Sequence, residues 1–278
     1  DRAKGRNNRL RPCCVSLGLR RQNTRQQARL RQQARCEGFN PFDRNAAMAP
    51  WEDFPEGEII SGTRKHNGVT LFEDKARGLT AGVWEQGANE SRWIDYPVNE
   101  FMTVLEGEVV IVEEDRTVSI KAGESFIIPK GLRCRWTQPG HVKKFFVIFE
   151  DASGLKNEGP LHTIKIDPKV KLDPSTPPAA AMLLSPVPVQ HAHDYFSDAT
   201  GQLNIGVWDT TGYHRKLIDF PRHELMCLLE GSVEFEDDKG QKQRFSAGDT
   251  FFVPMGTPNS WKSEGYLRKI FVIFQPSA

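Results

Sequence analysis

The chain contains one sequence unit written twice, and this repeat limits its folding options more than any other feature. "DYPVNEFMTVLEG" at 95–107 matches "DFPRHELMCLLEG" at 219–231, which is an offset of 124 residues. After a hairpin that is one residue longer in the second copy, "AGESFIIPKG" at 122–131 matches "AGDTFFVPMG" at 247–256. A period this long exceeds that of solenoid repeats. We therefore predict a duplicated domain, with copies over 59–149 and 183–274.

Each copy reads as a row of short strands separated by turn signals, with nothing long and helical between them. "VVIVEE" and "SVEFEDD" have β-branched or alternating character, and "LEG", "DDKG" and "PKG" are typical of turns. This spacing predicts an all-β fold, either sandwich or barrel. Ile164 and Ile166 can supply an extra edge strand. We expect a basic, disordered extension over 1–47, an N-terminal domain over 48–152, a proline-rich linker over 153–182 and a C-terminal domain over 183–278.

Positive charge is concentrated in the first 47 residues, which hold twelve Lys or Arg against three acids. This segment has no apolar core of a secretory signal, and Met48 would make a natural start. A non-native extension, a disordered tail, and a targeting or RNA-binding arm remain open for it. The rest of the chain is mildly acidic, which disfavours nucleic acid as a partner of the folded body.

The chain has no apolar run long enough for a membrane helix, so we expect no membrane partner. Three of the five cysteines lie in the basic segment, and only Cys134 and Cys227 remain in the repeats. No disulfide framework follows from this distribution, and a reducing, cytoplasmic location fits it best. We interpret these two cysteines as small apolar core residues, since no His/Asp partner at a recognisable spacing would activate them.

Two glycine-containing motifs occur in both copies, and they resemble the signature motifs of the cupins. Glu-x6-Gly ends at Gly107 and Gly231, and Gly-x5-Pro-x-Gly ends at Gly131 and Gly256. With "GVWE" and the repeated Trp and Lys, the chain resembles the DUF861 (cupin_3) family, similar to the C-terminal cupin of (S)-ureidoglycine aminohydrolase. The resemblance implies a bicupin: two tandem RmlC-like jelly-roll β-barrels, each with a small-molecule cavity.

The resemblance also implies a metal site that this sequence lacks. Metal-bearing cupins place His-x-His before the motif glutamate and a third His after the Pro-x-Gly glycine. Neither copy has that pair, and the third position holds Cys134 or Asn259. We therefore expect no bound metal. Glu224, His214 and Asn259 are the weak candidates for one, and Glu100 with Cys134 would hold a soft ion only with further ligands.

The other second-copy histidines do not repair this deficit. His223 is the neighbour of Glu224 on the expected strand, so its side chain should point to the opposite face. His191-x-His193 lies well upstream of the motif. We interpret His191, His193, His214 and His223 as surface or loop residues. A divalent metal such as Mn stays as the alternative cofactor.

A few large or polar residues recur in both copies and are candidates for the cavity wall. An unpaired charge inside an apolar barrel is costly, so we predict that Glu100 pairs with Lys144, and Glu224 with Lys269, in place of a metal. Each pair is either a purely structural ion pair or part of a ligand site. The ligand-pocket candidates are Trp84, Glu100, Met102, Trp136, Lys144, Trp208, Glu224, Met226, Asn259, Trp261 and Lys269.

Three functions remain open from sequence. The first is a cupin that binds a small polar metabolite in its barrel cavities without the usual histidine-based metal. The second is a metal-dependent aminohydrolase-like enzyme of ureide or nitrogen metabolism, and the third is a structural or storage-type bicupin with closed barrels. Catalytic residues are not identified, and the resemblance implies a homodimer formed through strand exchange or face-to-face sheets.

Overall fold

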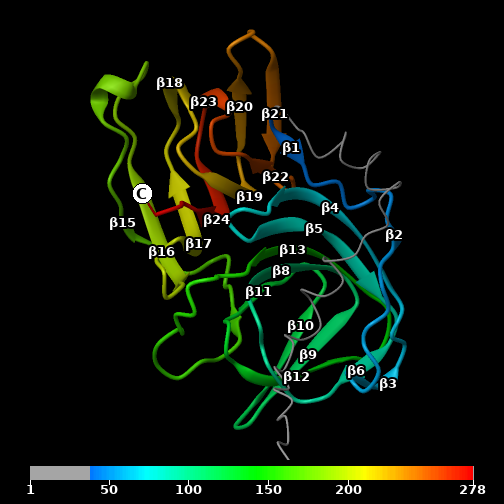
Figure 1. The fold of residues 1–278 in the computed structure, drawn as a ribbon. Helices are drawn as coiled ribbons and strands as arrows, with labels where there is room; N and C mark the ends of the chain where they lie inside the picture. Colours follow the sequence, from blue (N-terminus) through cyan, green and yellow to red (C-terminus); the bar gives the residue numbers. More distant parts are fainter. Residues whose placement is uncertain (1–37, 278) are drawn as a thin grey trace, which may run out of the picture.

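The computed structural model describes residues 38–277, so residues 1–37 of the basic extension predicted over 1–47 lie outside the described part. Two antiparallel β-barrels lie side by side, the first in the lower part of Figure 1 and the second in the upper part. Each barrel is a jelly-roll-like sandwich of a larger and a smaller sheet. The predicted all-β class and tandem arrangement are confirmed. No helix in the described part is long and apolar enough to cross a membrane.

The strands of the first barrel form two sheets. Across its larger sheet lie β14 (Ile164–Lys165), β11 (Ser125–Ile128), β8 (Asn99–Glu106), β13 (Val142–Phe149), β5 (Leu79–Gln86), β4 (His66–Asp74) and β2 (Ala49–Pro50). The facing sheet contains β10 (Thr117–Lys121), β9 (Glu108–Glu113), β12 (Arg133–Gln138), β6 (Asn89–Ser91) and β3 (Ile59–Gly62), and β7 (Ile94–Asp95) also pairs with β12.

The second barrel repeats this plan. Its larger sheet contains β1 (Asn40–Pro41), β22 (Thr250–Val253), β19 (His223–Glu230), β24 (Leu267–Phe274), β17 (Leu203–Thr210), β16 (Gln190–Ser197) and β15 (Asp173–Pro174). The facing sheet contains β18 (Tyr213–Asp219), β23 (Pro258–Ser263), β20 (Ser232–Glu236) and β21 (Lys242–Ser246). A short 3-10 helix, η1 (Ala180–Met182), lies between β15 and β16.

The larger sheets are apolar on both faces. The inner face of each sheet lines its own barrel, and the outer face packs against the larger sheet of the other barrel. One cluster fills each barrel, and a third joins outward-facing residues such as Phe101 and Phe145 to Leu225 and Val272. Strands buried on both faces read as continuous apolar runs, which explains "FFVIF" in β13. The face-to-face association that resemblance suggested between two chains thus occurs within one chain, and a homodimer stays a prediction.

The two barrels also exchange edge strands, which come from segments predicted from sequence as the extension and the linker. β14, from the expected linker, pairs with β11 of the first barrel, as the sequence suggested for Ile164. At the equivalent position 124 residues earlier, β1 pairs with β22 of the second barrel, and Phe42 is buried between the barrels. Residues 38–47 therefore differ from the expected disordered extension, because an edge strand and an apolar contact hold them.

His223 corrects the expectation of surface histidines. It points away from the interior of its own barrel, as predicted, but the other barrel covers that face and only 5% of the residue is exposed. Its Nδ1 accepts a hydrogen bond from the Met255 amide at 3.0 Å, and its ring lies against Phe72 of the first barrel. Burial lowers the pKa of His223, although Asp74, with a carboxylate oxygen 3.6 Å from Nε2, acts in the opposite direction.

Replacement of His223 tests the electrostatics of the barrel–barrel contact. Because its folded pKa lies below the ordinary 6.5, the unfolded chain takes up a proton first as the pH falls, and stability declines below about pH 6.5. His223→Asn copies Asn99, whose Oδ1 accepts the Lys130 amide at 2.9 Å in the first barrel. We expect the variant to lose less stability than the wild type between pH 6.5 and about pH 5 in urea unfolding.

His214→Asn is the matched control, because His214 is half-buried on β18, away from this contact. An unchanged pH slope in His223→Asn, or an equal change in the control, would contradict a neutral, buried His223.

Candidate functional site

Each barrel contains a buried ion pair between the two central strands of its larger sheet. Lys144 on β13 and Glu100 on β8 have Nζ and Oε1 2.8 Å apart, and their side chains are 5% and 0% exposed. Lys269 on β24 and Glu224 on β19 repeat this at 2.7 Å. The predicted pairing is confirmed. Alternation along β13 places Lys144 inward with Phe146 and Ile148, which sequence alone left open.

The recurring methionine and tryptophans surround each ammonium group. The Nζ of Lys144 lies 2.9 Å from the Met102 sulfur and 5.0 and 4.8 Å from the ring centres of Trp84 and Trp136. Desolvated cation–π contacts stabilise such a charge. The second barrel repeats this arrangement with Met226, Trp208 and Trp261, at 3.4, 4.8 and 5.2 Å from the Nζ of Lys269.

The second carboxylate oxygen of each glutamate has a different partner in the two barrels. In the first barrel, Oε2 of Glu100 accepts a hydrogen bond from the Tyr96 hydroxyl. In the second barrel, Phe220 occupies the position equivalent to Tyr96, and the Nε of Arg222 donates to Oε2 of Glu224 at 3.0 Å. One carboxylate thus has a single cation beside it, and the other has two.

These surroundings change the proton affinities of the paired groups. Burial lowers the pKa of Lys144 and of Lys269, because the charged ammonium loses its hydration, and the glutamate opposes this only in part. Burial alone would raise the pKa of Glu224, but Lys269 and Arg222 hold it below the ordinary value. Glu224 is therefore an ionised, weakly basic carboxylate.

The residues at the expected metal positions do not fit a divalent cation. Both oxygens of each motif glutamate already have donors, and an ammonium group occupies the space beside them. Asn259 is fully buried, but its Oδ1 accepts from Nη2 of Arg215 at 2.5 Å and it does not line the cavity. Burial raises the pKa of the Cys134 thiol to about 12, so it is a poor thiolate ligand.

The histidines do not complete a metal site in the barrels either. Among residues 38–277, the one cluster of three close metal-capable side chains is Glu113, Asp115 and His162, outside both cavities. His214 lies half-buried on β18 and does not line the second cavity. His191 and His193 are half-buried on β16, where Nδ1 of His191 lies 2.8 Å from Oδ1 of Asp209.

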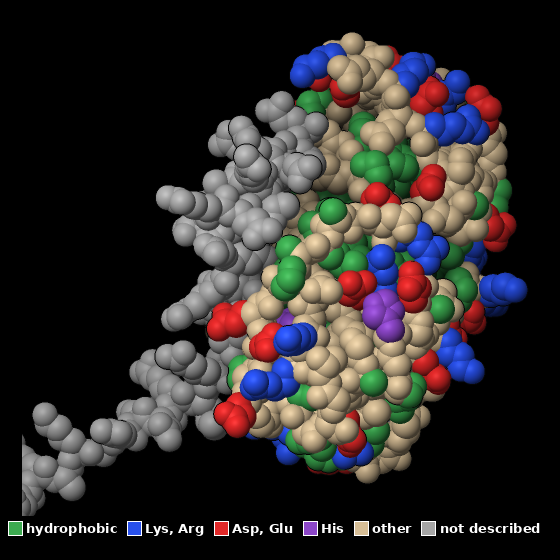
Figure 2. All heavy atoms as spheres, turned by 90° about the vertical axis from the view of Figure 1, so that its right-hand side faces the viewer, with side chains coloured by type: hydrophobic (Ala, Val, Ile, Leu, Met, Phe, Trp, Pro, Cys, Tyr) green, Lys and Arg blue, Asp and Glu red, His purple; other side chains and the backbone are tan. Residues whose placement is uncertain are grey.

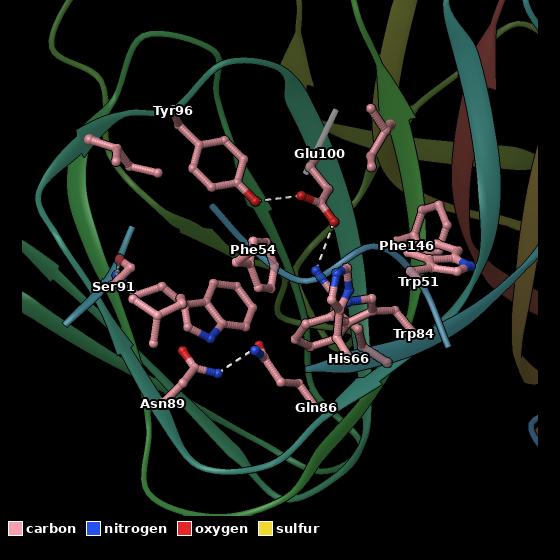
Figure 3. Close-up of a pocket in the computed structure, with 15 residues that line it drawn as sticks. Trp51, Phe54, His66, Trp84, Gln86, Asn89, Ser91, Tyr96, Glu100 and Phe146 are labelled. Carbon is pink, nitrogen blue, oxygen red and sulfur yellow. Dashed lines mark hydrogen bonds and ion pairs between the residues drawn. The ribbon is translucent and has the colours of Figure 1, made fainter. Parts of the chain in front are cut away.

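The cavity of the first barrel is small, with a volume of about 60 Å³. Trp51 and Phe54, from the N-terminal arm, are among the residues that line it (Figure 3). Phe54 stacks on His66 with ring centres 4.3 Å apart. Nε2 of His66 lies 2.8 Å from the Glu52 carbonyl, and its Nδ1 accepts from Nε1 of Trp84. These bonds need the neutral imidazole, which agrees with the burial-lowered pKa of His66.

The cavity of the second barrel has a volume of about 420 Å³, because smaller residues occupy the equivalent arm. Ser175 occupies the position equivalent to Trp51. The Ser175 amide donates to the Gln190 carbonyl, as the Trp51 amide donates to the His66 carbonyl. Pro178 replaces Phe54. The Trp51 ring packs against Gly68, where an added Cβ would lie only 2.5 Å from the ring. The residue equivalent to Gly68 in the second barrel is Ala192.

The structure brings most of the predicted pocket residues together, and adds others that sequence reasoning missed. Glu100, Trp84, Trp136 and Lys144 line the first cavity, while Met102 is in the core beside them. The second cavity is lined by Trp208, Glu224, Met226, Trp261 and Lys269, but not by Asn259. The missed residues are Trp51, His66, Tyr96, Arg215 and Arg222. Their signal in the sequence is a difference between the copies, which the repeat of shared residues does not carry.

Removal of one lysine tests the ion pairs. Lys144→Met leaves Glu100 buried with only the Tyr96 hydroxyl as a donor, so we expect a loss of about 3–5 kcal/mol in the free energy of unfolding. Lys269→Met should cost less, because Arg222 still neutralises Glu224. Urea denaturation measures both values.

Lys165→Met is the control, since Lys165 forms an exposed pair with Glu124 and should contribute less than about 1 kcal/mol. The double variant Glu100→Gln/Lys144→Met should recover most of the loss. A Lys144→Met variant as stable as the control would contradict a tightly held charge pair.

Comparison with known proteins agrees with this geometry. The family model of the EutQ-like cupin domain, Cupin_3, matches residues 73–146 and again 197–271. Among curated proteins, no sequence matches this chain.

Several solved structures share the fold. A protein of unknown function from Pseudomonas syringae pv. tomato, assigned to the DUF861 family, is 28% identical with a TM-score of 0.69, covering 84% of this chain and 98% of its own. A putative dioxygenase from Nostoc punctiforme is 13% identical with a TM-score of 0.55, covering 86% and 83%. A cupin 2 conserved barrel domain protein from Leptotrichia buccalis is 12% identical with a TM-score of 0.50, covering 78% and 92%. With its family domain present twice, the chain belongs to the Cupin_3 (DUF861) cupins.

Proposed function

We propose that this chain binds a small polar metabolite in the cavity of its second barrel, and that its first barrel is a closed structural partner. The observation that carries this proposal is the difference between cavities of about 420 and 60 Å³ within one repeated fold. Small-molecule sites commonly have volumes of about 300–1,000 Å³ and apolar walls with a few placed polar groups. The second cavity meets this description.

Binding is supported better than acid–base catalysis. A general base works best with a pKa near the working pH, but two cations lower the pKa of Glu224. A metal-dependent aminohydrolase-like reaction would need ligands that these barrels do not supply. We assign the structural role to the first barrel alone, because Trp51 and Phe54 occupy the space that a ligand would need there.

Closing the second cavity with the residues of the first tests the proposal. Ser175→Trp/Ala192→Gly transfers the Trp51–Gly68 contact to the second barrel, so the indole should occupy the mouth of the cavity. We expect native mass spectrometry of the wild type to find a small molecule retained from cells or a metabolite panel. The double variant should bind it at least about tenfold more weakly, since the two would overlap.

Ala192→Gly alone is the matched control and should bind as the wild type does. Equal retention by the double variant would contradict a site in this cavity.

A further inference from the structure

Two arginines that the repeat does not share give the second cavity a positive charge. At positions equivalent to Ser91 and Val98 of the first barrel, the second barrel has Arg215 and Arg222. The charged groups lining the second cavity are Arg215, Arg222, Lys269 and the single carboxylate of Glu224. The first cavity has only Lys144 and Glu100 with a neutral His66. One cavity is balanced, and the other has an excess of two positive charges.

Arg215 is fixed in the wall of the second cavity. The residue is 8% exposed; Nη1 donates to the carbonyls of Lys216 and Asn259, and Nη2 donates to the Asn259 side chain. These bonds use three of the five guanidinium N–H groups. Asn259 is itself held by the Thr257 carbonyl, so Arg215 is oriented by a rigid partner. Burial lowers the pKa of Arg215, and the nearby Arg222 adds to this effect.

Arg222 lies at the edge of the cavity, with a side chain that is 36% exposed. It donates to Glu224 through Nε and lies over the Phe220 ring. Within residues 38–277 its terminal Nη groups make no hydrogen bond, so these donors remain for another acceptor. All three cations line the same cavity. Burial is the main cause of the lowered pKa of Lys269, and the charges of Arg222 and Arg215 lower it further.

We propose that the second barrel recognises a small organic carboxylate, bound by Arg215 and Arg222 through its anionic group, with its apolar part against Trp208, Trp261 and Met226. This assignment rests on the proposed function and names its ligand class. An excess of positive charge in and around a cavity is unfavourable until an anion compensates it. Guanidinium groups match carboxylates in a bidentate geometry. The indole and thioether walls favour a ligand with a planar or hydrocarbon body over a compact inorganic ion.

Isothermal titration calorimetry with charged and neutral partners tests the carboxylate. The probes are benzoate and succinate, their amides benzamide and succinamide, and inorganic phosphate, all with the full chain. We expect at least one carboxylate to bind at least about tenfold more tightly than its amide. That affinity should fall as salt is added, since the contact is ionic.

Arg222→Gln keeps the shape of the edge but removes its charge, so it should weaken carboxylate binding about tenfold or more. Arg222→Lys should retain part of the affinity. Lys239→Gln, in the exposed turn between β20 and β21, loses the same charge outside the cavity and should bind as the wild type does. Arg215→Ser copies the first barrel but removes bonds to Asn259, so its thermal stability must be measured beside its affinity.

The outcomes separate the two proposals. If an amide binds as tightly as its carboxylate, or Arg222→Gln binds as the wild type does, the carboxylate assignment is wrong while the cavity remains a binding site. Binding of phosphate alone would also overturn the carboxylate. If no probe binds and native mass spectrometry finds no small molecule on the wild type, both the binding function and its ligand class are wrong.

Discussion

The salt bridge between a lysine and a glutamate on adjacent central strands is the interaction on which both barrels depend. In each barrel an ammonium group lies between the glutamate, a methionine sulfur and two indole rings. A buried carboxylate of this kind is tolerated only when a positive charge and hydrogen-bond donors satisfy it. The pair therefore explains why two tryptophans, one methionine and one lysine recur in both copies while the metal-binding histidines do not.

The two barrels share this ion pair but differ in the residues around it. In the first, Trp51 and Phe54 line the small cavity beside the pair, and Tyr96 donates to the carboxylate without adding charge. In the second, Ser175 and Pro178 leave the cavity open, and two arginines add charge without added carboxylates. The barrels are joined by one apolar layer and by exchanged edge strands. The face shown in Figure 2 has acidic and basic side chains interspersed, and extra positive charge is instead concentrated in the second cavity.

The sequence predicts the fold class, the duplication and the ion pairs well, because each has a local signal. The spacing of Glu, Gly and Pro marks strand ends and turns, and strand alternation places Glu100, Met102 and Val104 on one face. The burial of His223 could not be predicted, because it depends on which sheet face the other barrel covers. The same holds for the exchanged strand at Asn40, whose pairing partner is about 210 residues away. The repeat does not predict Arg215 and Arg222, because the equivalent residues of the first copy are Ser91 and Val98.

Nitrogen NMR of the lysine side chains tests the central claim most directly, because it reports whether the group beside each glutamate is a protonated, protected ammonium. With Lys144→Met and Lys269→Met for assignment, two slowly exchanging ammonium signals should be observed at neutral pH. Addition of a bound carboxylate should shift the Lys269 signal and leave the Lys144 signal unchanged. Neutral amine signals, rapid exchange with solvent at both sites, or an equal response of the two lysines would contradict an ion pair that is sealed in one barrel and accessible to a ligand in the other.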